Sequence, residues 1–158
     1  MKNILHIVFV ITTFALLSSC QPQPPLGLNE DASVKATDNL PENPLLLHAI
    51  TSGIQPKDST MFILYGNDAA FSYAGSHSDN HYPDGAVLYE VTWRQQEDEQ
   101  WIGANIPKEI TTIERVEYTV NEQPTYTLYQ GAPLKKVAGI NPALRLQVIC
   151  SQRMAVSP

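Results

Sequence analysis

A tight turn that leads into an alternating strand, near the middle of the chain, constrains the fold more than any other feature. The turn is Tyr82-Pro83-Asp84-Gly85, in which the proline ring pre-sets φ and the glycine adopts a positive φ at little cost. The segment that follows, Ala86–Arg94, alternates Val, Tyr, Val and Trp with Leu, Glu, Thr and Arg. This period of two predicts a strand with one apolar face and one largely polar face.

Other segments predict further strands. Thr60–Tyr65 is a continuous, mostly apolar run, Thr112–Val120 alternates, and Thr125–Tyr129 is a further short strand. Trp101–Ile106 predicts a short segment that returns from a solvated hairpin connection, before a turn at Pro107-Lys108. Five or six short strands with two small helices favour an α+β fold, mainly an antiparallel sheet with short flanking helices.

Two short helices are predicted before the central turn, and a strand at the end of the chain. Asn43 is a good helix cap, Pro44 suits the first helical position, and Gly53 is a plausible stop. A second helix is predicted over Asp68–Ala74, with Asn67 as its cap and Gly75 as its stop. The final segment predicts a half-buried strand, because its apolar residues share one parity: Leu144, Leu146, Val148, Cys150, Met154 and Val156.

The first twenty residues predict export and lipidation. Lys2 precedes an apolar run, Ile4–Leu17, whose 14 residues are too few to span a bilayer of about 30 Å comfortably. Leu17-Ser18-Ser19-Cys20 resembles a bacterial lipobox, in which the thiol of Cys20 accepts a diacylglyceryl group. An ordinary secretory signal with a chance cysteine is the alternative. The expected division is a lipoprotein signal peptide over residues 1–19, a flexible tether over 20–42 and one domain over 43–158.

The residue after the modified cysteine and the overall charge bear on location and partners. Gln21, rather than aspartate, follows Cys20. In lipoproteins resembling those of enteric bacteria, this favours a protein anchored to the outer membrane and facing the periplasm. The formal net charge of −6 argues against nucleic acid as a partner. Once Cys20 is acylated, Cys150 is the only other cysteine, so an intramolecular disulfide and a zinc site built on paired cysteines are both excluded.

Three stretches resemble the cytochrome P-460 domain family. Tyr65-Gly66-Asn67-Asp68-Ala69-Ala70 is similar to the start of that domain, and Tyr82–Trp93 is similar to its central turn and strand. Trp101–Pro107 and the segment ending Ser151-Gln152-Arg153 are similar to a lipoprotein branch that lacks the haem motif. The resemblance covers about Pro44 to Pro158. It implies an antiparallel sheet with flanking helices, often as a homodimer, with a c-type haem in many members.

The chain departs from this family at the haem attachment motif. It contains no Cys-x-x-Cys-His, and the nearest string, Cys150-Ser151-Gln152-Arg153-Met154, lacks the second cysteine and the histidine. Covalent haem is therefore not expected, and the identity of any cofactor stays unknown. The resemblance carries over the fold, whereas the family's nitrogen-oxide chemistry has no residue in this chain to transfer to.

Candidate site residues each have two interpretations. His77 and His81, with Asp79 between them, could bind a metal or haem, but their loop composition favours a solvated loop. Met154, like Cys150, could supply a sulfur ligand, whereas core packing suits both side chains. The many tyrosines and tryptophans could line a pocket for a flat ligand or fill the core: Tyr65, Tyr73, Tyr82, Tyr89, Trp93, Trp101, Tyr118, Tyr126 and Tyr129.

Three functions are compatible with these residues. The preferred hypothesis is a lipid-anchored periplasmic protein that binds a small ligand or another envelope protein. The second is a redox protein or enzyme with a haem or metal held without thioether links, for which His77, His81 and Met154 are the candidate ligands. The third is a purely structural envelope protein.

Overall fold

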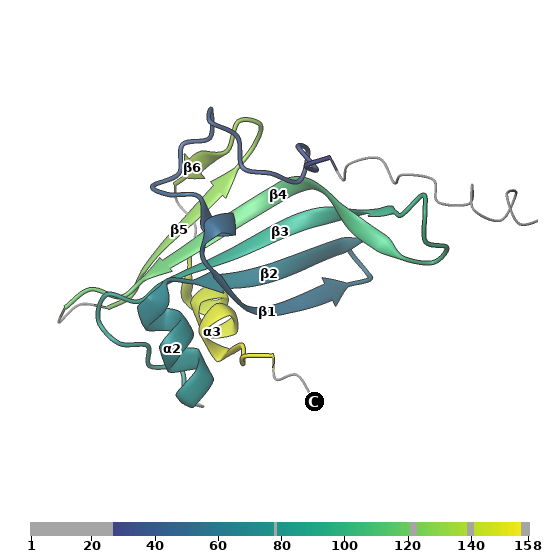
Figure 1. Ribbon diagram of the computed structural model, residues 1–158. Coiled ribbons are helices and arrows are strands. Elements are labelled where there is room, and N and C mark those ends of the chain that lie inside the picture. The colour runs from purple at the N-terminus through teal and green to yellow at the C-terminus, as the bar shows by residue number, and fades with distance from the viewer. Residues whose placement is uncertain (1–26, 78, 121–122, 139–140, 156–158) are drawn as a thin grey trace, which may run out of the picture.

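The computed structural model describes residues 27–77, 79–120, 123–138 and 141–155. Within them, six strands pair in the order in which they occur along the chain, and each pairs antiparallel with the next. This meander confirms the α+β, mainly antiparallel prediction (Figure 1). The strands are β1 (His48–Gln55), β2 (Thr60–Gly66), β3 (Val87–Glu97), β4 (Asn105–Glu117), β5 (Thr125–Gln130) and β6 (Lys135–Val137).

The predicted central turn and strand are confirmed. The backbone N–H of Ala86 donates to the carbonyl of Pro83 at 3.0 Å, and Gly85 has a φ of 82°. This is the geometry in which glycine at the third turn position avoids a side-chain clash. β3 then lies between β2 and β4, where Val91 pairs with Ile63 on one side and Ile113 on the other.

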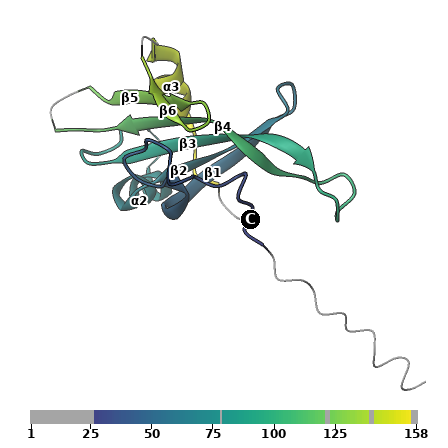
Figure 2. The ribbon, with the colours of Figure 1, turned by 90° about the horizontal axis from the view of Figure 1, so that it is seen from above.

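The sheet is covered on both faces by different parts of the chain. Helices α2 (Asp68–Ser76) and α3 (Ala143–Ser151) cover one face, here called the helix face. Residues 32–47 pack against the other, here called the groove face. Figure 2 shows α3 and the N-terminal segment on opposite sides of the sheet. Glu90, on the side of β3 that was expected to be polar, is therefore only 2% exposed.

The first predicted helix is wrong beyond its first turn. Asn43 caps a 3₁₀ turn, η1 (Pro44–Leu46), by accepting from the backbone N–H of Leu45 at 3.0 Å. The chain then enters β1, which pairs with β2 from His48 to Gln55. Gly53 does not stop a helix but faces Phe62, whose ring would lie 2.5 Å from a Cβ at this position. Backbone pairing with β2 decides this segment, because a nine-residue helix has little stability of its own.

The predicted C-terminal strand is also wrong. Residues 143–151 form α3, with Leu146, Ile149 and Cys150 packed in the core at helical spacing. Leu144 and Val148, which share the apolar parity, are 77% and 46% exposed. The sequence predicted a strand because Arg145, a polar residue, lies on the inward face of α3. With this position polar, the apolar residues of the segment alternate along the sequence.

The second predicted helix is confirmed, although α2 continues through Gly75 to Ser76. Its cap, Asn67, does more than begin the helix. The Asn67 Oδ1 accepts from the backbone N–H groups of Ala70 and Val87, at 3.0 and 3.2 Å, and its Nδ2 donates to the Gly85 carbonyl at 2.8 Å. One side chain therefore joins the start of α2 to the central turn and the start of β3.

Two other expectations change. β4 runs continuously from Asn105, with Pro107 paired to Gln95 inside it, so the expected turn at Pro107-Lys108 is absent.

The described part of the predicted tether, residues 27–42, lies on the sheet: Asp38 accepts from the backbone N–H of Leu134 at 2.8 Å. Residues 20–26 lie outside the described residues. Among the described residues, no helix is long and apolar enough to cross a membrane.

Candidate functional site

A hairpin formed by the ends of β3 and β4 extends past the neighbouring strands (Figure 1). Its register runs from Gln95 opposite Pro107 to Glu97 opposite Asn105. Asp98 closes the tip, because its backbone N–H donates to the Ala104 carbonyl at 3.0 Å. Its carboxylate also accepts from the backbone N–H of Gln100 at 2.8 Å. The hairpin is therefore a defined wall rather than a loose loop.

The first described residues of the chain run beside this hairpin. Asn29 donates from Nδ2 to the Pro107 carbonyl at 2.8 Å, and its Oδ1 accepts from the backbone N–H of Ala32 at 3.3 Å. The Ala32 carbonyl in turn accepts from the indole Nε1 of Trp93 at 2.9 Å. Between the hairpin and this segment lies a groove of about 740 Å³, here called the Trp93 groove.

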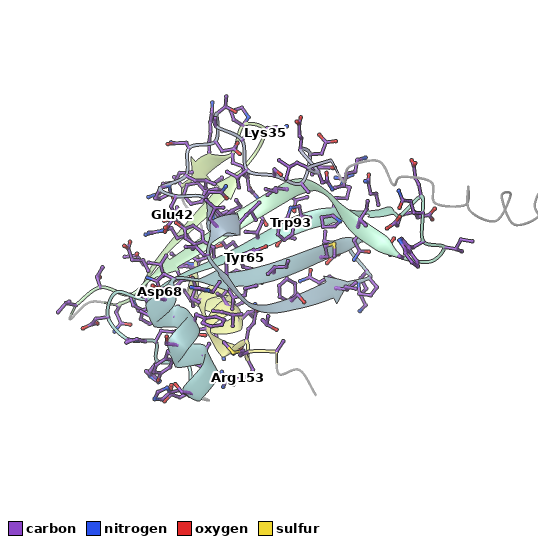
Figure 3. The ribbon with its side chains drawn as sticks, in the orientation of Figure 1. Lys35, Glu42, Tyr65, Asp68, Trp93 and Arg153 are labelled. Carbon is purple, nitrogen blue, oxygen red and sulfur yellow. The ribbon has the colours of Figure 1, made fainter. Side chains whose placement is uncertain are left out.

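The floor of the Trp93 groove consists of Ile63, Tyr65 and Trp93. Ile63 and Tyr65 are two apart on β2, so both point to the groove face, and Figure 3 shows Tyr65 and Trp93 on neighbouring strands. Trp93 is 3% exposed and its indole N–H is already bonded. The Tyr65 hydroxyl makes no hydrogen bond to any described residue, and burial raises its pKa, so it stays a protonated donor.

The rim of the Trp93 groove is acidic. Glu97, Asp98 and Glu99 line it, and no lysine, arginine or histidine is among the described residues that do so. Trp101, 70% exposed, stands at the outer end. The negative potential of such a rim disfavours an anionic ligand and favours a neutral or cationic one.

A second cluster of functional groups lies on the helix face. Glu90 and Glu114 are directly opposite each other on β3 and β4, and both are nearly inaccessible. Arg145 from α3 lies between them: its Nη2 is 2.6 Å from Glu90 Oε1 and 2.6 Å from Glu114 Oε2, and its Nε donates to Glu114 at 2.8 Å. Tyr126 donates to Glu114 at 2.5 Å, and the Gln152 amide donates to Glu90.

This buried cluster joins α3 to the sheet, because Arg145 on the helix contacts one carboxylate on each of β3 and β4. Burial raises the pKa of Glu90, and this effect exceeds the lowering of the pKa by Arg145, whose guanidinium is shared between two carboxylates. The hydrogen bonds to both carboxylates raise the pKa of Arg145, which stays charged. Breaking such a pair by removing one partner leaves an uncompensated buried charge.

The structure places the sequence-predicted ligand residues around the C-terminal end of α2, each with contacts of its own. His77 stacks on the ring of Tyr73 with centroids 4.0 Å apart. Asp79 accepts from the Tyr73 hydroxyl and from the backbone N–H of His81. No group of three or more His, Cys, Asp or Glu side chains could hold a metal within the described ranges. Cys20 lies outside those ranges.

The sulfur-containing residues pack against the core beneath the helices. Met154 packs on the helix-face core next to Gly75. Cys150 is buried, and its Sγ lies 3.0 Å from the Tyr118 hydroxyl. Burial raises the pKa of the Cys150 thiol, which is therefore neutral and unreactive at neutral pH. As ligands, His77, His81 and Met154 stay predictions.

The predicted aromatic residues divide between two roles. Tyr65, Trp93 and Trp101 line the groove, whereas others fill the cores, such as Tyr89 with 0% and Tyr129 with 5% exposure. The sequence reading missed the opposite wall, Leu28 and Ala32, because that segment was assigned to a tether. Apolar residues spaced through it, such as Val34 and Leu40, were the available signal.

The groove and the buried cluster therefore differ in what they can do. The Trp93 groove has an aromatic floor, an acidic rim and a Tyr65 hydroxyl that has no hydrogen-bond partner among the described residues. These features suit the binding of a small ligand, and the volume falls within the range of about 300–1,000 Å³ for ligand sites. No protein-family model matches this chain, and the search of curated proteins found no match.

Proposed function

We propose that this chain is a lipid-anchored periplasmic protein that binds a small, largely apolar ligand, neutral or positively charged, in the Trp93 groove. The observation that carries the proposal is the groove itself, with about 740 Å³ of space over Ile63, Tyr65 and Trp93. Its acidic rim, without a described basic residue, supports the choice of charge.

The chemistry of the groove sets the expected strength of binding. Burying about 200 Å² of apolar ligand surface contributes on the order of 5 kcal/mol before the costs of association. The Tyr65 hydroxyl supplies one hydrogen-bond donor to orient a polar group. Since no described side chain in the groove is arranged as a nucleophile with a base, the proposal is binding without catalysis.

The test is a titration of the purified domain with two naphthalene probes of similar shape and different charge. The neutral N-phenyl-1-naphthylamine is expected to bind with energy transfer from tryptophan, and the anionic 8-anilinonaphthalene-1-sulfonate several-fold more weakly. Replacing Glu99 with lysine should strengthen binding of the anionic probe, whereas Asp84→Lys, an equal charge change at the exposed central turn, should not. Equal binding of both probes, unchanged by Glu99→Lys, would contradict the proposed site.

The lipid anchor is a separate part of the proposal and has its own support. The Leu17-Ser18-Ser19-Cys20 string after an apolar run is what supports acylation at Cys20. Labelling cells with palmitate is expected to mark the wild-type chain and not Cys20→Ser. Labelling that is independent of Cys20, or absent, would remove the anchor and leave the groove proposal standing.

We further propose that the fold is that of the cytochrome P-460-like family, as a branch without covalent haem. The support is that two of the similar stretches, residues 65–70 and 82–93, are joined by the hydrogen bonds of Asn67. The domain exported to a periplasm supplied with haem is expected to be colourless. A Soret band at about one haem per chain would contradict this and favour the redox alternative, with His77, His81 and Met154 as the next targets.

A further inference from the structure

We infer that the tip of the β3–β4 hairpin contacts the surface of the membrane that carries the lipid anchor, with Trp101 and Ile102 in the interfacial layer. The inference rests on the proposed acylation of Cys20. It assigns an orientation to the domain, with the Trp93 groove opening beside the bilayer.

The tip presents two large apolar side chains from a fixed backbone. Trp101 is 70% exposed and Ile102 is fully exposed. The backbone N–H of Ala104 donates to the Trp101 carbonyl at 3.0 Å, and Gly103 has a φ of 82°, which closes the turn. Tryptophan is enriched at membrane interfaces because its ring is apolar and its N–H is polar, and an isoleucine beside it adds apolar area.

The length of chain between the anchor and the domain brings the tip near the bilayer. Leu28 lines the same groove as Trp101, and Asn29 bonds to β4, so the described chain begins beside the hairpin. Cys20 and Leu28 are eight positions apart. Eight residues span at most about 28 Å when fully extended, and about 15 Å on average as a flexible chain. The hairpin end of the domain therefore faces the membrane, and α3 does not.

The acidic residues near the hairpin tip favour a zwitterionic membrane surface over an anionic one. Glu97, Asp98 and Glu99 lie just behind the tip, so an anionic surface repels it within a Debye length of about 8 Å at physiological salt. A zwitterionic surface has no such effect. The expected partner is thus a phosphatidylcholine- or phosphatidylethanolamine-like surface.

The experiment uses the acylated mature chain in phosphatidylcholine vesicles, with and without brominated acyl chains that quench tryptophan. Quenching of Trp101 is expected and should disappear in Trp101→Phe, since Trp93 is buried on the sheet. Ile102→Asp should reduce the quenching several-fold, whereas Leu144→Asp, which changes a large, exposed apolar residue on α3, should not. Adding phosphatidylglycerol should lower the quenching.

Unquenched Trp101 in a chain that carries palmitate would overturn the inference, and so would equal effects of Ile102→Asp and Leu144→Asp. Palmitate labelling separates this failure from failure of the anchor. Binding of N-phenyl-1-naphthylamine separates it from failure of the groove, because Ile102 does not line the groove.

Discussion

Both faces of the sheet are covered, although the alternation in β3 predicts one apolar and one largely polar face. β3 contributes Glu90 to the helix face and Trp93 to the groove face, three positions apart. Both side chains are nearly inaccessible, at 2% and 3% exposure, but Glu90 lies beneath α3 whereas Trp93 lies on the floor of a groove of about 740 Å³. Residue polarity along a strand therefore tells which positions share a face, but not which face is open.

The reason is the kind of element that covers each face. On the helix face α3 brings Arg145 to both carboxylates, so each buried carboxylate has a charged hydrogen-bond partner and the helix packs closely on the sheet. On the groove face a segment without regular secondary structure lies along the hairpin and leaves space beside Trp93. Substitutions that remove contacts on the helix face should lower stability, whereas substitutions on the groove face should affect ligand binding.

Removal of Arg145 should have the largest effect. Arg145→Met leaves Glu90 and Glu114 buried without a cation and should lower the free energy of unfolding by about 3–5 kcal/mol. Arg94→Met, which breaks an exposed ion pair with Glu109, should cost about 1 kcal/mol or less. Urea unfolding at pH 7 measures both. Equal losses would mean that the cluster does not hold α3, and adding Glu90→Gln and Glu114→Gln should recover part of the Arg145→Met loss.

Substitutions in α3 should have effects on stability that follow helical rather than strand burial. Ile149→Ala should cost about 2–5 kcal/mol because the side chain is fully buried, and Leu144→Ala should cost about 0.5 kcal/mol or less because it is exposed. A strand with the parity of Leu144 and Leu146 would reverse this order. Thermal unfolding of the two variants distinguishes helix from strand.

The pH dependence of stability should separate buried from exposed carboxylates. Burial raises the pKa of Glu90 above 4.5, so the stability associated with its proton is complete below pH 4.5 and is lost as the pH rises through the raised value. One such proton changes the free energy of unfolding by at most about 1.4 kcal/mol per pH unit. Glu90→Gln should remove this dependence on pH.

Glu117 provides the comparison of opposite sign. Arg115 lowers its pKa through a hydrogen bond of 2.7 Å, so its contribution is present above pH 4.5 and is lost as the pH falls. Denaturant unfolding from pH 3 to 8 measures both profiles. A Glu90→Gln profile parallel to that of the wild type would contradict the assignment of the raised pKa to Glu90.

The smallest effect is expected on the groove face. Tyr65→Phe should weaken a ligand that accepts from the hydroxyl by about 1 kcal/mol, which is roughly fivefold, and leave the unfolding free energy unchanged. Tyr126→Phe, which removes one of the donors to buried Glu114, should instead lower stability and leave binding unchanged. Probe titration and urea unfolding of the same two variants test whether binding and stability belong to separate faces.

Local patterns were sufficient for the centre of the fold and failed at its ends. The Pro83–Ala86 turn, β2, β3 and the Asn67 cap of α2 follow from residue types that act over a few positions. The segments after Pro44 and after Asn141 are apolar at both two-residue and helical spacing, and their choice between strand and helix depends on distant partners. For the first the partner is β2, and for the second it is the pair of carboxylates on β3 and β4.

The candidate site shows the same limit. Tyr65, Trp93 and Trp101 could be named from the sequence as aromatic residues suited to a pocket or a core, because their chemistry is local. Their separation into groove and core, the wall formed by Leu28 and Ala32, and the shared arginine of Glu90 and Glu114 arise from contacts between residues 31 to 61 positions apart. Such contacts depend on how the whole chain packs, which no short-range pattern of residue types encodes.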